Sequence, residues 1–195
     1  METKITYFEK TGEENTEATL VLARQRAEEL GIKKIVAASS SGATAVKAMD
    51  VFKGFNVVIV THVFGGREPD THDFLDSNRK IVESKGGTIL TTTHGLGGIS
   101  MAFQGDPPQP GRPPGRKNVL GDIVVYTLNM FGRGSKVACE ITAMAADSGM
   151  VRTDEEVIAI AGTHSGADTA LVIQPNNVHR FFDMKIKEII CKPRL

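Results

Sequence analysis

The chain has 195 residues, 41% of them hydrophobic and 24% charged, which is typical of a globular domain with a sizeable core. It carries 23 Lys and Arg against 23 Asp and Glu, so no net field attracts nucleic acid or an anionic membrane surface. No apolar run approaches the ~20 residues that span a bilayer, and the N-terminus lacks a signal-peptide core. We therefore expect one cytoplasmic domain over residues 1–195, with neither nucleic acid nor a membrane as partner.

The chain alternates apolar runs with helical patterns through its first half and returns to this rhythm near its end. Continuous apolar runs suit strands that are covered on both faces, and alternation with helices indicates a mainly parallel sheet with right-handed crossovers. The predicted strands are 3–8, 35–38, 55–62, 88–94, 156–162, 169–173 and 184–191, and the predicted helices are 16–30, 43–49, 71–84, 118–131 and 135–148.

Three details of this pattern bear on topology. The first and last predicted strands are expected at edges of the sheet. The gap between strands 156–162 and 169–173 is too short for a crossover helix, so these two should be antiparallel neighbours. Between His94 and the next helix the pattern breaks, and a proline-rich loop occupies residues 105–117. We interpret this loop either as a lid that brings Arg112 and Arg116 over an anionic ligand, or as an oligomer contact or a mobile surface loop.

The most informative stretch follows the second strand. Three serines and Gly42 join the strand to a helix that begins at Ala43. Amide groups in the first turn of a helix lack intrahelical partners, and the helix dipole is positive there, so such a turn can hold a phosphate or carboxylate. The alternative is that Ser41 caps the helix while Gly42 eases the turn. Three consecutive hydroxyls exceed the needs of a cap, which favours the anion site. A Gly42→Asp change should then abolish binding and leave the fold intact.

Three histidines stand at or just beyond the ends of predicted strands. They are His62, His94 and His164, and the carboxyl ends of parallel strands form the edge at which open α/β sheets bind ligands. The three can converge to bind a metal ion with a water as fourth ligand, or donate to a ligand, or simply bond to backbone. Asp168 follows a second turn rich in hydroxyls and glycine, where it can bind a ligand hydroxyl or cap the turn.

Two segments, Ser39-Ser-Ser-Gly-Ala-Thr44 and Ile158-Ala-Ile-Ala-Gly-Thr-His-Ser-Gly-Ala-Asp-Thr169, resemble turns of the pyruvate kinase C-terminal domain. With Glu14-Asn-Thr-Glu17 and Ala145-Ala-Asp-Ser-Gly149, the chain is similar to the stand-alone archaeal and bacterial group of such domains. The resemblance covers all but the proline-rich loop. It implies an α/β fold of three layers, with a mainly parallel sheet of about five strands, helices on both faces and one antiparallel strand near the end.

The resemblance also implies a ligand. In pyruvate kinases with a sugar-bisphosphate effector, the Ser-Gly turn holds a phosphate and the later glycine-rich turn closes over it. No barrel domain is present, so pyruvate kinase activity is not expected, and Ala43 replaces a basic residue that often serves a sugar bisphosphate. For the stand-alone group the implied ligand is flavin mononucleotide (FMN). The implied site residues are Ser39, Ser40, Ser41, Gly42, Ala43, Thr44, Thr163, His164, Ser165, Gly166, Ala167, Asp168 and Thr169.

We thus expect a phosphorylated small molecule, with FMN first, bound at the carboxyl edge of the sheet. Met101 and Phe103 are candidate contacts for its apolar ring, with core packing as an equal alternative. Whether the chain is an enzyme stays open: the same cleft suits a flavin-dependent reductase or a histidine-metal hydrolase. The third interpretation is a ligand-sensing regulatory or oligomerising subunit, which would form a homo-oligomer.

Overall fold

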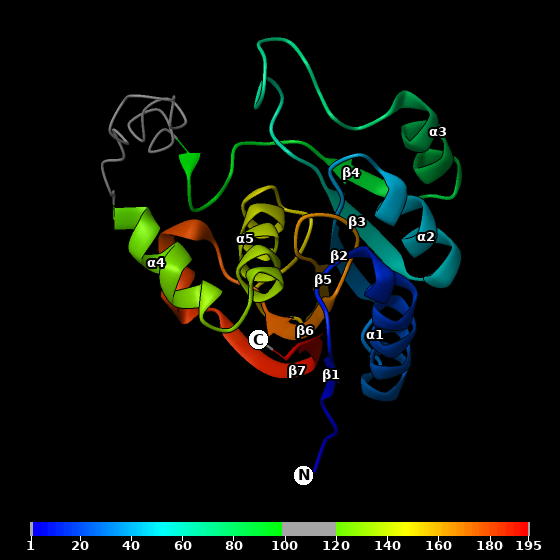
Figure 1. Ribbon diagram of the computed structural model, residues 1–195, viewed down its shortest axis with the longest axis vertical. Coiled ribbons are helices and arrows are strands. Elements are labelled where there is room, and N and C mark those ends of the chain that lie inside the picture. The colour runs from blue at the N-terminus through cyan, green and yellow to red at the C-terminus, as the bar shows by residue number, and fades with distance from the viewer. Residues whose placement is uncertain (1, 99–119, 195) are drawn as a thin grey trace.

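The computed structural model describes residues 2–98 and 120–194, and it contains one seven-stranded sheet with helices on both faces (Figure 1). The order of the strands across the sheet is β1-β7-β6-β5-β2-β3-β4. The strands are β1 (Thr6–Phe8), β2 (Lys34–Ala38), β3 (Asn56–Val60), β4 (Thr88–Leu90), β5 (Val157–Ala161), β6 (Thr169–Gln174) and β7 (Lys185–Pro193).

Helices cover the sheet on two sides, which makes three layers as expected. Helices α1, α2 and α3 follow one another along one face, and α5 lies against the other face with α4 packed beside it (Figure 1). None of the helices in the described ranges is long and apolar enough to cross a membrane. Their bounds are α1 (Thr16–Leu30), α2 (Ala43–Val51), α3 (Asp76–Ser84), α4 (Leu120–Asn129) and α5 (Arg133–Asp147), with 3-10 turns η1 (Glu13–Asn15) and η3 (Val178–Asp183).

Strand β2 shows why its sequence is apolar without alternation. Successive side chains of a strand point to opposite faces of the sheet. Ile35 and Ala37 join the core beneath α1 and α2, whereas Val36 joins the core beneath α5. All three are fully buried. A strand with helices on both sides has no solvent-facing position, so a continuous apolar run is the expected pattern.

The pairing of the strands confirms a mainly parallel sheet. β2 pairs in parallel with β3 and β5, and β3 with β4. β6 runs antiparallel to β5, with Val157 opposite Ile173, as the short connection between them predicted. The consequence for function is that β2, β3 and β5 all end at one edge of the sheet.

The far side of the sheet differs from expectation. There are seven strands instead of about five, and β7 is not at an edge, because it pairs with β6 on one side and β1 on the other. β1 is the edge strand, as predicted, and Thr6 lies opposite Cys191. The alternating pattern of β7 misled the edge assignment: its first half is exposed, whereas Cys191 is fully buried.

Helix α3 and strand β4 are among the predicted elements that are shorter in the structure. Helix α3 begins at Asp76 rather than at residue 71, because Asp70 has a positive φ of 60° and Leu75 is extended. The amide of Leu75 donates to the carbonyl of Ser41 instead of joining a helix. Strand β4 ends at Leu90, and the Thr91 hydroxyl beyond it lies 2.7 Å from the Thr61 hydroxyl. A backbone hydrogen bond to Ser41 thus takes the place of a helix before α3, and a side-chain hydrogen bond takes the place of strand pairing after β4.

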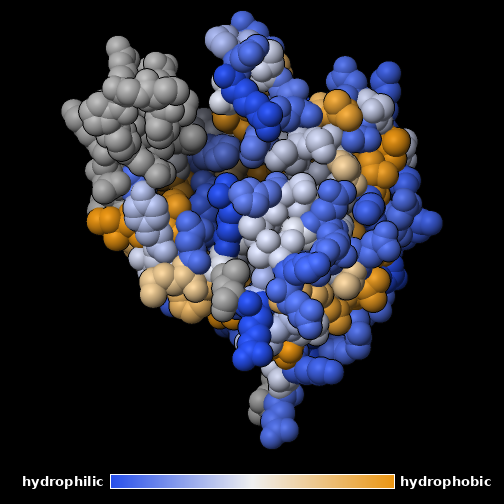
Figure 2. Space-filling model, in the orientation of Figure 1, coloured by the Kyte–Doolittle hydropathy of each residue, from blue (hydrophilic) through white to orange (hydrophobic). Residues whose placement is uncertain are grey.

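Helix α4 is unusual in leaving large apolar side chains in solvent. Figure 2 shows a hydrophobic surface on the side of the molecule where α4 lies. Ile123 is 61% exposed and Met130, just beyond the helix, is 79% exposed. Such a surface is compatible with the expected homo-oligomer, which stays a prediction.

Burial predicts how single substitutions affect this fold. Ile59→Ala removes a fully buried side chain from the centre of β3, and we expect it to lower the free energy of unfolding by about 2–5 kcal/mol. The matched control is Ile81→Ala on α3, whose side chain is 37% exposed and should matter far less. Urea denaturation followed by circular dichroism measures both. Equal losses in the two variants would contradict the assigned core.

Candidate functional site

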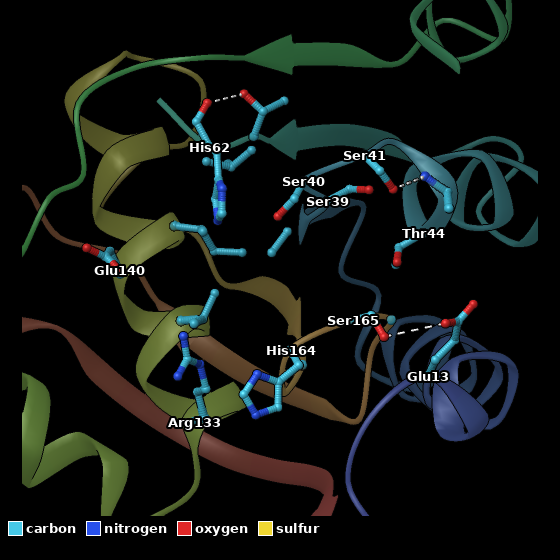
Figure 3. A pocket seen from close by; sticks show the side chains of 18 of the residues that line it. Glu13, Ser39, Ser40, Ser41, Thr44, His62, Arg133, Glu140, His164 and Ser165 are labelled. Atoms are coloured by element: carbon cyan, nitrogen blue, oxygen red, sulfur yellow. Dashed lines mark hydrogen bonds between the residues drawn. The ribbon is translucent and has the colours of Figure 1, made fainter. Parts of the chain in front are cut away.

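A pocket of about 530 Å³ opens where β2, β3 and β5 end, and it is the setting for the predicted site (Figure 3). Its walls come from the β2–α2 turn, the end of β3, the β5–β6 turn and one side of α5. The structure thus brings together both turns that the sequence singled out. The predicted residues that line the pocket are Ser39, Ser40, Ser41, Ala43, Thr44, His62, His94, His164, Ser165 and Gly166.

Several predicted site residues lie outside this lining. Their side chains or backbone support the two turns from behind and do not face the pocket. Met101 and Phe103 lie outside the described residues, as does the proline-rich loop 105–117. The predicted residues behind the turns are Gly42, Thr163, Ala167, Asp168 and Thr169.

The three serines of the first turn divide into two roles. The Ser39 hydroxyl accepts a hydrogen bond from the Ala45 amide at 3.2 Å, and the Ser41 hydroxyl makes a longer one, 3.5 Å, with the Ala43 amide. The N-cap residue of α2 is Gly42, so the prediction that Ser41 occupies the N-cap is wrong, although both serine hydroxyls bond amides in the first turn of α2. Ser40 makes no side-chain hydrogen bond within the described residues, and it lies on the pocket side of the turn (Figure 3). Its hydroxyl is available to a ligand.

Gly42 is required by the packing of the turn. Its φ is 93°, a region that side chains disfavour, and an added Cβ would lie 2.6 Å from the Asn78 Cβ and 3.0 Å from the Phe74 ring. The expectation that Gly42→Asp would leave the fold intact is therefore wrong. Ala43, the next residue, is exposed and lines the pocket, so it is the better position for a test.

The second turn is held by a buried carboxylate. Asp168 is fully buried, and its Oδ2 accepts hydrogen bonds from the amides of Gly12 at 2.9 Å and Thr163 at 3.1 Å. Its Oδ1 accepts one from the Thr169 hydroxyl at 2.8 Å. Asp168 thus caps its turn and ties it to the segment before α1, in line with the structural alternative. His164 follows Thr163 with a positive φ of 64° and lines the pocket.

The hydrogen bonds of the Asp168 carboxylate predict that its removal strongly lowers the stability of the fold. Asp168→Ala leaves the buried Gly12 amide and the partly buried Thr163 amide without an acceptor, and hydrogen bonds to charged groups contribute about 1.5–3 kcal/mol each. We expect the free energy of unfolding to fall by roughly 3 kcal/mol or more. Asp154→Ala removes a carboxylate of an exposed pair with Arg152 and should change stability little. Guanidinium melts compare the two, and similar midpoints would refute this role for Asp168.

Helix α5 forms a wall of the pocket that the sequence reasoning missed. Val137, Ile141 and Met144 were assigned to the core from their helical spacing, yet they also line the pocket, together with Arg133 and Lys136 of the first turn. A stripe at core spacing looks the same whether it faces a packed core or a cavity. The one sequence feature that could have indicated this wall was the pair of basic residues, Arg133 and Lys136, that follows Gly132.

The charge of the lining favours anions. Among the described residues that line the pocket, four are basic and two, Glu13 and Glu140, are acidic. Lys136 lies 2.6 Å from Glu140 and neutralises it. Arg133 has no ion pair within the described residues, so its charge is available at the pocket wall. The basic residues are Lys47, Arg67, Arg133 and Lys136.

Of the three histidines, two come together. The rings of His62 and His94 lie 5.6 Å apart between centroids, whereas His164 lies across the pocket on the β5–β6 turn (Figure 3). Burial lowers the pKa of His94; His62 and Lys136 lower it further, and Glu140 opposes the shift. This imidazole is therefore neutral at neutral pH. The described residues contain no group of three or more His, Cys, Asp or Glu side chains arranged to hold a metal ion.

Most of the chain matches a known protein family. Residues 17–173 match the family model described as the pyruvate kinase, alpha/beta domain. The chain belongs to this family. The match runs from α1 into β6, so it includes both turns, α5 and the pocket between them, while β1, η3 and β7 lie outside it. The predicted family and the predicted α/β fold are confirmed.

Proposed function

We propose that the pocket binds a phosphorylated small molecule, with FMN as the favoured ligand and the phosphate at the β2–α2 turn. The observation that carries the proposal is the start of α2, which opens into a pocket in which basic side chains outnumber acidic ones. No pyruvate kinase activity is included, because the family match is to the alpha/beta domain alone.

The phosphate end is supported by the chemistry of the turn. The dipole of α2 favours a negative charge at its N-terminus, and early amides of the helix have no carbonyl partner within it. The Ser40 hydroxyl, which has no hydrogen-bond partner among the described residues, adds a donor, and Lys47 adds a positive charge from the next turn of α2, although it also lies 3.6 Å from the exposed Glu17. The Ala43 side chain is small and neutral, which suits one phosphate more than two.

The opposite end of the pocket suits an apolar ring. Val60, Val137, Ile141 and Met144 contribute apolar lining, and His62 and His94 add polar groups that can bond a ring carbonyl or amide. A volume of about 530 Å³ falls in the range of roughly 300–1,000 Å³ common to small-molecule sites. A flavin has this division into a tricyclic ring and a phosphate joined by a hydroxylated chain.

Of the two enzymatic alternatives, a flavin-dependent reductase would hold FMN in the same orientation, with its phosphate at the β2–α2 turn. A hydrolase with a three-histidine metal site is less favoured, because His164 stands on the opposite wall from the other two. Reduction of bound FMN by a nicotinamide donor would distinguish a reductase from a binding or regulatory protein.

The turn is tested by Ala43→Asp. The new carboxylate lies at the first position of α2, where it should leave stability unchanged or raise it by about 0.3–1 kcal/mol. A like charge about 4 Å from the phosphate costs roughly 4 kcal/mol near a protein surface, so FMN affinity should fall at least about 100-fold. Riboflavin, which lacks the phosphate, should bind both proteins equally. Quenching of flavin fluorescence measures all four affinities.

The matched control is Ala18→Asp, the same change at an exposed alanine in the first turn of α1, outside the pocket lining. It should bind FMN like the wild type. Undiminished FMN affinity in Ala43→Asp would place the phosphate elsewhere. Failure of the wild type to bind FMN at all would remove FMN and leave inorganic phosphate as the next probe of the turn.

A further inference from the structure

We propose that His62 and His94 bind one divalent transition-metal ion at the mouth of the pocket, with water or ligand oxygens completing its coordination. The inference concerns the protein alone and does not depend on FMN. It rests on two independent observations: the separation of the two rings and the carboxylates that stand behind them.

The separation of the rings matches two imidazoles on one ion. A histidine nitrogen binds such an ion at about 2.0–2.1 Å, which puts the ring centre roughly 3.2 Å from the metal. At a tetrahedral angle the two centres are then roughly 5–6 Å apart. The centroids of His62 and His94 are 5.6 Å apart, and the ring planes are inclined at 51°, so the rings are not stacked. No large backbone movement is needed to bring both rings to one ion.

A carboxylate lies behind the same nitrogen of each ring. The Nδ1 of His62 is 3.4 Å from Asp73 Oδ2, and the Nδ1 of His94 is 4.0 Å from Glu140 Oε1. A carboxylate on that side favours the tautomer with the proton on Nδ1 and leaves the Nε2 lone pair for another partner. Histidine ligands of metals almost always have such an outer partner. For His62 this is the arrangement expected when Nε2 is the ligand atom, whereas Glu140, at 4.0 Å, is too far from His94 for a hydrogen bond and contributes only a nearby charge.

Both carboxylates are themselves anchored. Arg67 Nε lies 3.3 Å from Asp73, and Lys136 Nζ lies 2.6 Å from Glu140. Glu140 also accepts a hydrogen bond from the Leu96 amide at 3.1 Å, just beyond His94. Glu140 is therefore a buried, fixed carboxylate on α5, whereas Asp73 is held on the β3–α3 loop by an ion pair with the exposed Arg67. Pre-positioned ligands of this kind lose little freedom when an ion binds.

The chemistry of the pair selects the ion. Imidazole nitrogens suit Zn²⁺, Co²⁺ and Ni²⁺, whereas Mg²⁺ and Ca²⁺ prefer oxygen. With no third protein ligand among the described residues, the ion keeps open positions toward the pocket. A site with open positions can polarise an oxygen of a bound ligand, unlike a closed structural site.

The test is a titration of tag-free protein with Co²⁺, followed by visible absorbance and calorimetry. We expect one ion per chain, and His62→Gln and His94→Gln should each weaken binding at least about tenfold. Asp73→Asn should weaken it less, because it removes only the outer partner of His62. The matched control is His164→Gln, which alters a third histidine of the same pocket but should leave the affinity unchanged.

Absence of stoichiometric binding would overturn the proposal. So would an affinity that is insensitive to His62 and His94, or one that falls equally in His164→Gln. Should a variant fail to fold, imidazole ¹⁵N spectra of the wild type with Zn²⁺ give the answer: of the five histidines, only His62 and His94 should shift at Nε2. Because no phosphorylated compound is present, this outcome is separate from that of the FMN titration.

Discussion

The parallel pairing of β2 with β3 and β5 is the constraint on which the rest of the structure depends. Parallel strands end at the same edge, so the turns that follow them are brought together although more than 120 residues separate Ser39 from His164 in the chain. Burial on both faces fixes the register of these strands, since each apolar side chain has a core to enter. The pocket is a consequence of this arrangement.

The residues that line the pocket stand beside others that stabilise the fold. Ser39 and Ser41 bond the first turn of α2, whereas Ser40 has no side-chain partner in the part of the chain that the structure describes; Asp168 fixes the second turn from behind while His164 and Ser165 line the pocket. Helix α5 contributes apolar side chains to the core beneath it and basic ones to the pocket. Rigid supports of this kind are what hold a binding site in one geometry.

Charge is distributed unevenly around a chain whose formal net charge is zero. Basic side chains gather at the pocket, yet Lys136 and Arg67 are each paired with a carboxylate that also stands behind a histidine. The pocket therefore combines basic side chains with the His94 imidazole, whose pKa is lowered by burial.

Much of this protein was determined by its sequence. Apolar runs without alternation predicted strands covered on both faces, and a gap too short for a crossover predicted that β6 would run antiparallel to β5. The Ser-Gly and Gly-Thr-His-Ser-Gly turns were identified from residue types, because only certain residues adopt such turns and cap such helices. These features are local, so the sequence carries them directly.

Only the tertiary structure decided which of these residues share a pocket. Helical spacing cannot say that Ile141 and Met144 face a cavity, that Asp168 points away from it, or that His94 stands beside His62 but not His164. The place of β7 inside the sheet was likewise beyond the sequence pattern. Each depends on contacts between residues distant in the chain, and periodicity records only which side of an element is apolar, not what lies opposite it.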